Sequence, residues 1–329
     1  RNMLQSEEVW PFSCPILSKH TSSVNNMSYR IECIPNVSTA DPAILERIAA
    51  AIEATEGVTL HFVDPGKSAN RSVFTYLGPA SQVLKATESL FAIALSEIDM
   101  RQHQGVHPRM GAVDVCPFVL LDDETHADDL LERVRTFAKD ISTKHDLAIY
   151  GYEYLASSSE RKNLAAVRQG EYEGLEGRFA SGDLPDFGPQ TFTPAVALHG
   201  ATAMSVRPLM VAYNVNLVGG EVKERLRAAK AIAGKIRERD GGMQGVKAIG
   251  WYLPDFDLVQ VSCNLTKPNE AGVCEVFTRV QELAAALGFE APSSELIGCI
   301  PQSQFTTLTS AELGFGQLKP FNERRILDI

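Results

Sequence analysis

The order in which strand-like and helix-like segments alternate is the feature that most restricts the possible folds of this chain. Residues 29–35 and 58–63 alternate apolar and polar side chains, which is typical of strands. Between them, an aspartate and a proline at 41–42 are followed by an apolar stripe at helical spacing. Turn-forming residues at 64–70 then lead to another strand-like segment at 72–77, which predicts a hairpin.

A helix from residue 81 and a strand at 113–121 complete the order β-α-β-β-α-β, and a further helix and strand follow. The same order recurs over 207–300, with its last strand expected at 296–300. This order is the split-βαβ, ferredoxin-like signature. We therefore predict an α+β fold of two tandem ferredoxin-like subdomains with facing sheets and helices on the outer faces. The predicted parts are a flexible N-terminal extension (1–26), an N-terminal subdomain (27–206) and a C-terminal subdomain (207–329).

Charge and cysteine content exclude several classes of partner. The chain has 31 Lys+Arg against 41 Asp+Glu, a net charge of −10, whereas nucleic-acid binding requires clustered cations. No apolar run approaches the roughly 18 residues that span a bilayer. Cys33, Cys116 and Cys263 lie in apolar, strand-like runs, which is typical of buried thiols in a reducing compartment. We expect a cytoplasmic protein with neither nucleic-acid nor membrane partners.

Two segments have the composition of functional loops. The first, RQHQGVHPRMGAVDVCPF, brings histidine, arginine, glycine and proline into a loop that enters a buried strand. Its His103 and His107 are four residues apart, as in some metal sites, but Gly105 and Pro108 favour a loop and no third ligand follows. We therefore predict no metal, with a metal hydrolase as an alternative. The second, DFGPQTFTPAVALHGAT (186–202), is typical of a ligand-lining loop between two domains.

These segments belong to a set of strings that together resemble the formiminotransferase family. The matching strings are IECIPNVS (31–38), VDPGKSANRSVFTYLGP (63–79), EIDMRQHQGVHPRMGAVDVCPF (97–118), RQGEYEGL (168–175), PDFGPQTFTP (185–194), HGAT (199–202), VAYNVNL (211–217) and IGWYL with QVSCNL within 249–265. The resemblance implies transfer of a formimino group from N-formimino-L-glutamate to N5 of tetrahydrofolate as co-substrate. It also implies a homodimer and a folate groove between two facing subdomains.

The same resemblance assigns site residues. The catalytic histidine of HPRMG falls on His107, and the acidic residue of the VD-x-G turn falls on Asp64. The folate-lining loop falls on residues 188–200, of which the expected binding residues are Gly188, Pro189, Gln190, Thr191, Phe192, Thr193, Pro194, His199 and Gly200.

The chemistry of the implied reaction suits these residue types. N5 must lose a proton and the departing glutamate nitrogen must gain one, and an imidazole with an ordinary pKa near 6.5 can do both. A carboxylate such as Asp64 can orient the imidazole or stabilise the cationic formimino group. Arg109 and Arg207 are candidates for binding substrate carboxylates. Besides the metal hydrolase, two alternatives stay open: a glutamate formyltransferase that uses 5-formyltetrahydrofolate, and a non-catalytic folate-binding relative.

Overall fold

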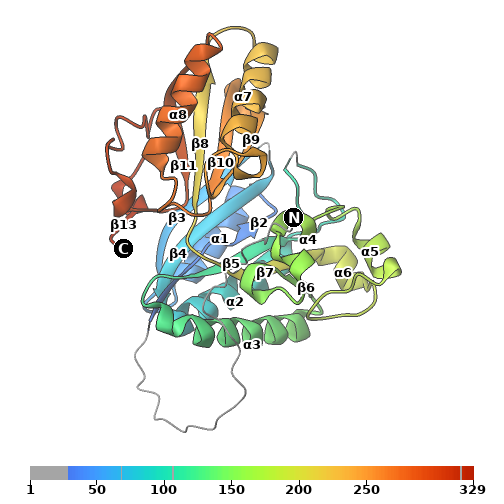
Figure 1. Ribbon diagram of the computed structural model, residues 1–329. Helices are drawn as coiled ribbons and strands as arrows, with labels where there is room; N and C mark the ends of the chain where they lie inside the picture. The colour runs from blue at the N-terminus through green and yellow to red at the C-terminus, as the bar shows by residue number, and fades with distance from the viewer. Residues whose placement is uncertain (1–28, 68, 106, 319–320) are drawn as a thin grey trace, which may run out of the picture.

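The computed structural model describes residues 29–67, 69–105, 107–318 and 321–329, and the predicted extension 1–26 lies outside them. The described chain forms a seven-stranded sheet, a four-stranded sheet and a short two-stranded sheet. Figure 1 shows the two larger sheets in separate halves of the molecule, each with its own layer of helices. No helix in the described ranges has the length and apolar character that crossing a bilayer requires.

The first half contains the predicted β-α-β-β-α-β order, including the 58–77 hairpin. The N-cap predicted at Asp41 is confirmed, since its side chain accepts hydrogen bonds from the backbone N–H groups of Ala43 and Ile44. The elements are β1 (Arg30–Cys33), β2 (Asn36–Val37), α1 (Pro42–Glu53), β3 (Thr59–Gly66), β4 (Arg71–Pro79), α2 (Ala80–Glu97), β5 (Val113–Leu120), α3 (Ala127–His145), β6 (Ala148–Gly151), α4 (Leu164–Val167), α5 (Leu175–Ser181), α6 (Pro194–His199) and β7 (Ala201–Val206).

Strand β7 was not predicted, and it makes the first sheet mixed rather than purely antiparallel. It lies between β5 and β6 and is parallel to both. All six of its residues are buried, because a central strand of a sheet covered on both sides has no solvent-facing positions. The alternation used to find the other strands is therefore missing from its sequence, ATAMSV.

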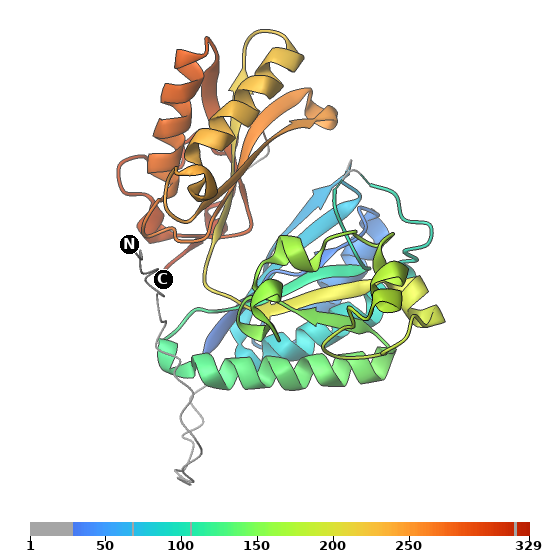
Figure 2. The ribbon, with the colours of Figure 1, turned by 45° about the vertical axis from the view of Figure 1, so that its right-hand side comes forward.

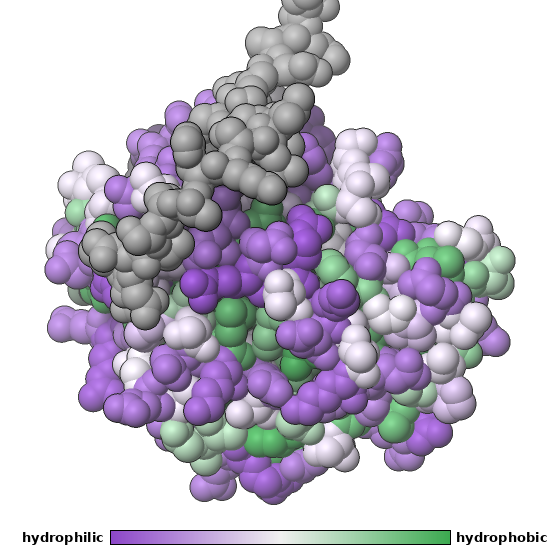
Figure 3. All heavy atoms as spheres, turned by 90° about the horizontal axis from the view of Figure 1, so that it is seen from below, coloured by the Kyte–Doolittle hydropathy of each residue, from purple (hydrophilic) through white to green (hydrophobic). Residues whose placement is uncertain are grey.

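Apolar cores lie on both faces of the first sheet. On one face, α1, α2 and α3 pack on β1, β4 and β5 through a cluster that includes Ile48, Phe74, Leu90 and Val134. In Figure 2, α3 lies below the strands of this sheet, and the molecule seen from below is mostly hydrophilic with separated apolar patches (Figure 3). On the other face, a separate cluster that includes Phe179 and Val196 packs with residues of β5, β6 and β7.

The second half also has the predicted β-α-β-β-α-β order, in an antiparallel sheet with strand order β11-β8-β10-β9. Its cysteine Cys263 is buried, as are Cys33 and Cys116 in the first half, which confirms the expectation for these thiols. The elements are β8 (Val211–Val218), α7 (Val222–Ile236), β9 (Val246–Leu253), β10 (Leu258–Leu265), α8 (Val273–Ala286), β11 (Glu290–Ile297), β12 (Ile300–Pro301) and β13 (Ile326–Leu327).

The bounds predicted for the last strand were wrong. Strand β11 begins at Glu290 and ends at Ile297, because Gly298 has a φ of 76° and turns the chain so that Ile300 joins the separate strand β12. The first part of β11 is polar, since one of its faces belongs to a buried polar layer. There, Asn216 donates to Ser293 at 2.8 Å.

The end of the chain fastens the two halves together. Arg325 donates to Asp64 of β3 from Nη1 at 2.9 Å and from Nη2 at 2.5 Å. Its guanidinium also lies 3.9 Å from the centre of the Phe62 ring. The short turn Glu323–Arg325, just before β13, therefore lies against β3, although about 260 residues separate them in sequence.

Candidate active site

Close backbone contacts fix the loop that carries the HPRMG motif. The N–H of Met100 donates to the carbonyl of Leu198 at 2.9 Å, and the N–H of Ala112 donates to that of His199 at 2.8 Å. A Cβ added to Gly111 would lie 2.2 Å from the carbonyl oxygen of Ala201. Only glycine permits this approach, so the motif glycine locks the loop against the start of β7.

His107 is held as a neutral imidazole, and no hydrogen bond to its Nε2 is found among the residues that the structure describes. Its Nδ1 lies 2.8 Å from the carbonyl oxygen of Pro108. Since a carbonyl only accepts hydrogen bonds, Nδ1 carries the proton and Nε2 has a free lone pair. Burial, together with the positive charges of Arg71 and Arg168, lowers the pKa of His107 from 6.5 to about 4. The ring is therefore uncharged at neutral pH, and the ordinary pKa near 6.5 expected from the sequence was wrong, because burial and two nearby guanidinium groups disfavour the charged form.

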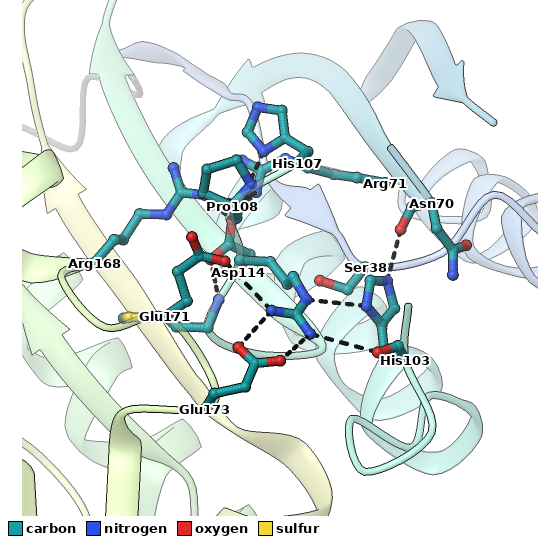
Figure 4. A network of polar contacts seen from close by, with 12 residues as sticks. Ser38, Asn70, Arg71, His103, His107, Pro108, Asp114, Arg168, Glu171 and Glu173 are labelled. Carbon is teal, nitrogen blue, oxygen red and sulfur yellow. Dashed lines mark hydrogen bonds and ion pairs between the residues drawn. The ribbon is translucent and has the colours of Figure 1, made fainter. Parts of the chain in front are cut away.

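The Pro108 carbonyl is the meeting point of three donors (Figure 4). Arg71 donates to it from Nη1 at 3.3 Å, and Arg168 donates to it from Nη2. Both guanidinium groups also form ion pairs with Asp114, whose side chain is fully buried. Asp114 accepts a further hydrogen bond, 2.8 Å long, from the N–H of Met110. One buried carboxylate thus fixes both arginines beside the His107 ring.

His103 and Arg109 form a second group, on the other side of the loop in Figure 4. Both Nη atoms of Arg109 donate to the carboxylate of Glu173, at 2.8 and 2.6 Å. Its Nε donates to Nδ1 of His103 at 3.2 Å. Nε2 of His103 donates to the carbonyl of Asn70 at 2.8 Å. Both nitrogens of His103 are occupied, and burial lowers its pKa. Within the described ranges, no three His, Cys, Asp or Glu side chains are placed to hold a metal.

Asp64 lies at the contact between the two halves. Its carboxylate accepts hydrogen bonds from Arg325 and, at 3.2 Å, from the N–H of Gly298. Asp64 and Arg325 line a small hollow with residues of β11, and His107 is not among its lining residues. Among the described residues, no hydrogen bond or ion pair joins Asp64 to His107.

The loop predicted to line the folate site divides into two parts. Its end, at His199 and Gly200, contacts the HPRMG loop directly. Its first part lies at the start of β6, where a Cβ on Gly188 would lie 2.1 Å from the carbonyl oxygen of Leu147. Three other members of the loop are held locally: Thr193 donates to Asp146, Gln190 donates to the Gly188 carbonyl, and Phe192 packs on Phe179.

Arg207 lies far from the histidine. It follows β7, and its N–H donates to the carbonyl of Phe118 near the end of β5. Strands β5 and β7 are parallel. Arg207 therefore lies at the C-terminal ends of these strands, whereas His107 precedes the N-terminal end of β5. The structure therefore does not bring Arg207 to His107.

Sequence reasoning did not single out Arg71, Arg168 and Asp114. All three lie inside strings that carry the family resemblance, but nothing in the local pattern joins them. One signal was available. Asp114 is a charge inside the otherwise apolar run AVDVCPF, and a buried aspartate is rare unless it is paired.

A neutral imidazole beside paired guanidinium groups can accept a proton next to an anion. Two sequence profiles identify the family: residues 30–207 match the formiminotransferase domain, N-terminal subdomain, and residues 212–324 match the formiminotransferase domain. The chain belongs to the formiminotransferase family.

Individual relatives agree with this assignment. A formimidoyltransferase-cyclodeaminase of Dictyostelium discoideum is 38% identical over 84% of this chain and 51% of its own length. The glutamate formimidoyltransferase of Streptococcus pyogenes serotype M1 is 36% identical over 84% of this chain and 90% of its own length. That of Thermoplasma acidophilum is 33% identical over 91% and 96%. The chain thus spans about half the length of the cyclodeaminase relatives and nearly all of the shorter ones.

Proposed function

We propose that this protein is a glutamate formimidoyltransferase, which moves the formimino group of N-formimino-L-glutamate to N5 of tetrahydrofolate. The products are 5-formiminotetrahydrofolate and L-glutamate. Membership of the family and the names of the shorter relatives support this reaction. The observation that carries it for this chain is the neutral His107 ring, whose free Nε2 is that of a general base.

In this proposal His107 handles one proton in both directions. As N5 of tetrahydrofolate bonds to the formimino carbon, Nε2 accepts the proton from N5. The same nitrogen then delivers the proton to the glutamate nitrogen as the carbon–nitrogen bond to glutamate breaks. No net proton is gained or lost, so a single imidazole suffices. The Pro108 carbonyl holds Nδ1–H throughout and keeps the ring in the required tautomer.

The remaining predicted residues keep supporting roles in the proposal. Asp64 faces the cationic formimino group from the contact between the halves, where Arg325 orients it. Arg109 organises the loop, and His199 and Gly200 border the tetrahydrofolate site.

The proposal extends to the whole molecule. We propose two ferredoxin-like subdomains with facing sheets, divided near residue 206, which the element order of each half supports. We further propose a cytoplasmic homodimer whose ligands are small molecules, without a metal, a nucleic acid or a membrane.

Turnover of N-formiminoglutamate with tetrahydrofolate tests the proposal, followed as the methenyl product that forms after acid treatment. His107→Ala should lower kcat by about 10²–10⁴, the usual contribution of a general acid–base, and should leave tetrahydrofolate affinity unchanged. His126→Ala is the control, since His126 stacks on Tyr29 beyond the far end of β5. An unchanged kcat in His107→Ala would remove the residue from the mechanism. Turnover only with N-formylglutamate would favour formyl transfer.

A further inference from the structure

We infer that Arg168, supported by Arg71, binds the α-carboxylate of the formimino donor. This inference rests on the proposed function. It adds to that function the residues that bind one particular group of the donor substrate. It replaces neither His107 nor the tetrahydrofolate site. It concerns which of the several carboxylates on the two substrates comes next to the reacting nitrogen.

The first observation is the place of the two guanidinium groups. Both contact the carbonyl oxygen of Pro108, and the His107 ring donates to that same oxygen at 2.8 Å. The His107 ring, Arg71 and Arg168 therefore converge on one carbonyl oxygen, as Figure 4 shows for the labelled side chains, and we place the ligand between Nε2 of His107 and the guanidinium group of Arg168.

The second observation is the local charge. Arg71 and Arg168 share the carboxylate of Asp114, and Arg109 forms ion pairs with Glu171 and Glu173, so the charges of the whole cluster balance. Glu171 also acts electrostatically on Arg168. Asp114 is fully buried and lies beneath the arginines, on the side away from His107. Arg71 and Arg168 are nevertheless the charged groups that act on His107, and guanidinium groups in that position favour an anion beside the imidazole.

The third observation is a donor without an acceptor. Nε of Arg168 is buried and has no hydrogen-bond partner in the described part of the chain. The contacts of this guanidinium with Asp114 and Pro108 are made by Nη2. Leaving a buried donor unsatisfied is costly, and a carboxylate is the group that the remaining edge of a guanidinium fork fits.

Chemistry decides which carboxylate this is. In N-formiminoglutamate, the α-carboxylate is attached to the carbon that bears the reacting nitrogen. When Nε2 of His107 reaches that nitrogen, the α-carboxylate must lie close to the imidazole. The carboxylates of tetrahydrofolate, in contrast, are separated from N5 by the whole aminobenzoyl group. A carboxylate site beside His107 therefore belongs to the donor.

Two isomeric donors provide the test. N-formimino-2-aminobutyrate keeps the α-carboxylate and lacks the γ-carboxylate, whereas N-formimino-4-aminobutyrate lacks the α-carboxylate. With the unmodified protein, we expect kcat/KM to fall roughly tenfold to hundredfold when the α-carboxylate is missing, the value of one charged hydrogen-bonded pair. Arg168→Gln should lower kcat/KM by a similar factor for the donors that have the α-carboxylate. It should change kcat/KM little for the 4-aminobutyrate donor, since the two losses are the same interaction.

Arg168→Lys separates charge from shape, because a lysine keeps the charge but not the fork; we expect it to recover only part of the loss. The control is Arg101→Gln, since Arg101 is exposed and pairs with Asp99 two residues away. Equal losses for both isomeric donors in Arg168→Gln would make Arg168 a structural residue and overturn the inference. Failure of the unmodified protein to use N-formiminoglutamate at all would instead overturn the proposed function.

A measurement on the unmodified protein tests the inference without depending on the folding of a variant. L-Glutamate or 2-aminobutyrate, bound at the arginine pair, should raise the pKa of His107 observed by NMR, because the carboxylate offsets the guanidinium charges. 4-Aminobutyrate should raise it much less. If the two isomers raise the pKa of His107 equally, or neither does, the α-carboxylate does not bind at Arg168.

Discussion

Whether the His107 imidazole is protonated decides whether it can accept a proton from a substrate. Its surroundings set this protonation state. Burial and the charges of Arg71 and Arg168 both disfavour the imidazolium, and they lower its pKa from 6.5 to about 4. The proton-accepting form is therefore present above about pH 4 and is lost only as the pH falls through that value.

An NMR titration of histidine ring protons measures this directly, with His107→Ala to assign the resonance. We expect His107 to titrate well below 6.5. In Arg168→Gln its pKa should rise, because one of the charges that oppose protonation is gone. A titration near 6.5 in the unmodified protein would show that the ring lies in water and not beside the arginine pair.

The sequence could identify His107 but not the reason it works. The HPRMG string points to the residue, and the chemistry of the reaction requires an imidazole. The arginines that surround it come from β4 and from the turn after α4, far apart in sequence and each in an ordinary local pattern. Only the fold brings them to one carbonyl oxygen. For the same reason, the sequence made Arg109 a candidate for binding a substrate carboxylate, whereas in the structure both of its Nη atoms donate to Glu173.

Among the secondary-structure elements, the junction between α6 and β7 has the strictest backbone requirement near the site. Gly200 has a φ of 69°, and a Cβ there would lie 2.2 Å from the carbonyl oxygen of Met110. Gly200→Ala should lower the free energy of unfolding by about 1–3 kcal/mol through backbone strain. It should also lower kcat, because relief of the clash displaces the loop that holds His107.

The matched control is Gly177→Ala in α5. Gly177 is exposed, and nothing lies within 4 Å of an added Cβ. Alanine should therefore stabilise this helix by about 0.5–1 kcal/mol and leave kcat unchanged. Chemical denaturation of both variants measures the free energy of unfolding, and steady-state kinetics measures kcat. Gly200→Ala with unchanged stability would mean that the loop and β7 are not in this close contact.

A strand could be predicted from the sequence when its two faces differ in their exposure to solvent. Strands β3, β4, β9 and β10 were found because turn residues separate them and their faces have different environments. Strand β7 is buried on both faces, and β11 begins with polar residues that face a buried polar layer. In both cases the environment that sets the residue pattern is made by strands from elsewhere in the chain.

For the molecule as a whole, the sequence predicted two units with facing sheets but not which residues join them. The contacts join residues from opposite ends of the chain, such as Asp64 with Arg325 and His61 with the Arg324 carbonyl. Glu32 of β1 is a third example. Its buried carboxyl group contacts the thiol of Cys299 from the second half. Periodicity carries no information about such pairs, because each partner satisfies its own local pattern.

Glu32 makes the stability of this contact depend on pH. Burial raises the pKa of its carboxyl group from 4.5 to about 7, although the charge of Arg207 and the hydrogen bond with Cys299 partly oppose the shift. Between these two values the folded protein binds more protons than the unfolded chain. The contribution of Glu32 to stability is therefore complete below about pH 4.5 and is lost as the pH rises through 7.

Glu32→Gln should remove this loss, because a glutamine stays neutral. Urea unfolding at pH 5 and pH 8 should show a variant that is stabilised at pH 8 relative to the unmodified protein, by up to about 3 kcal/mol from the size of the pKa shift. At pH 5 the two proteins should differ much less. Glu46→Gln, on the exposed face of α1, controls for the loss of a surface charge. If Glu32→Gln changes stability equally at both pH values, the carboxyl group of Glu32 is not buried in this contact.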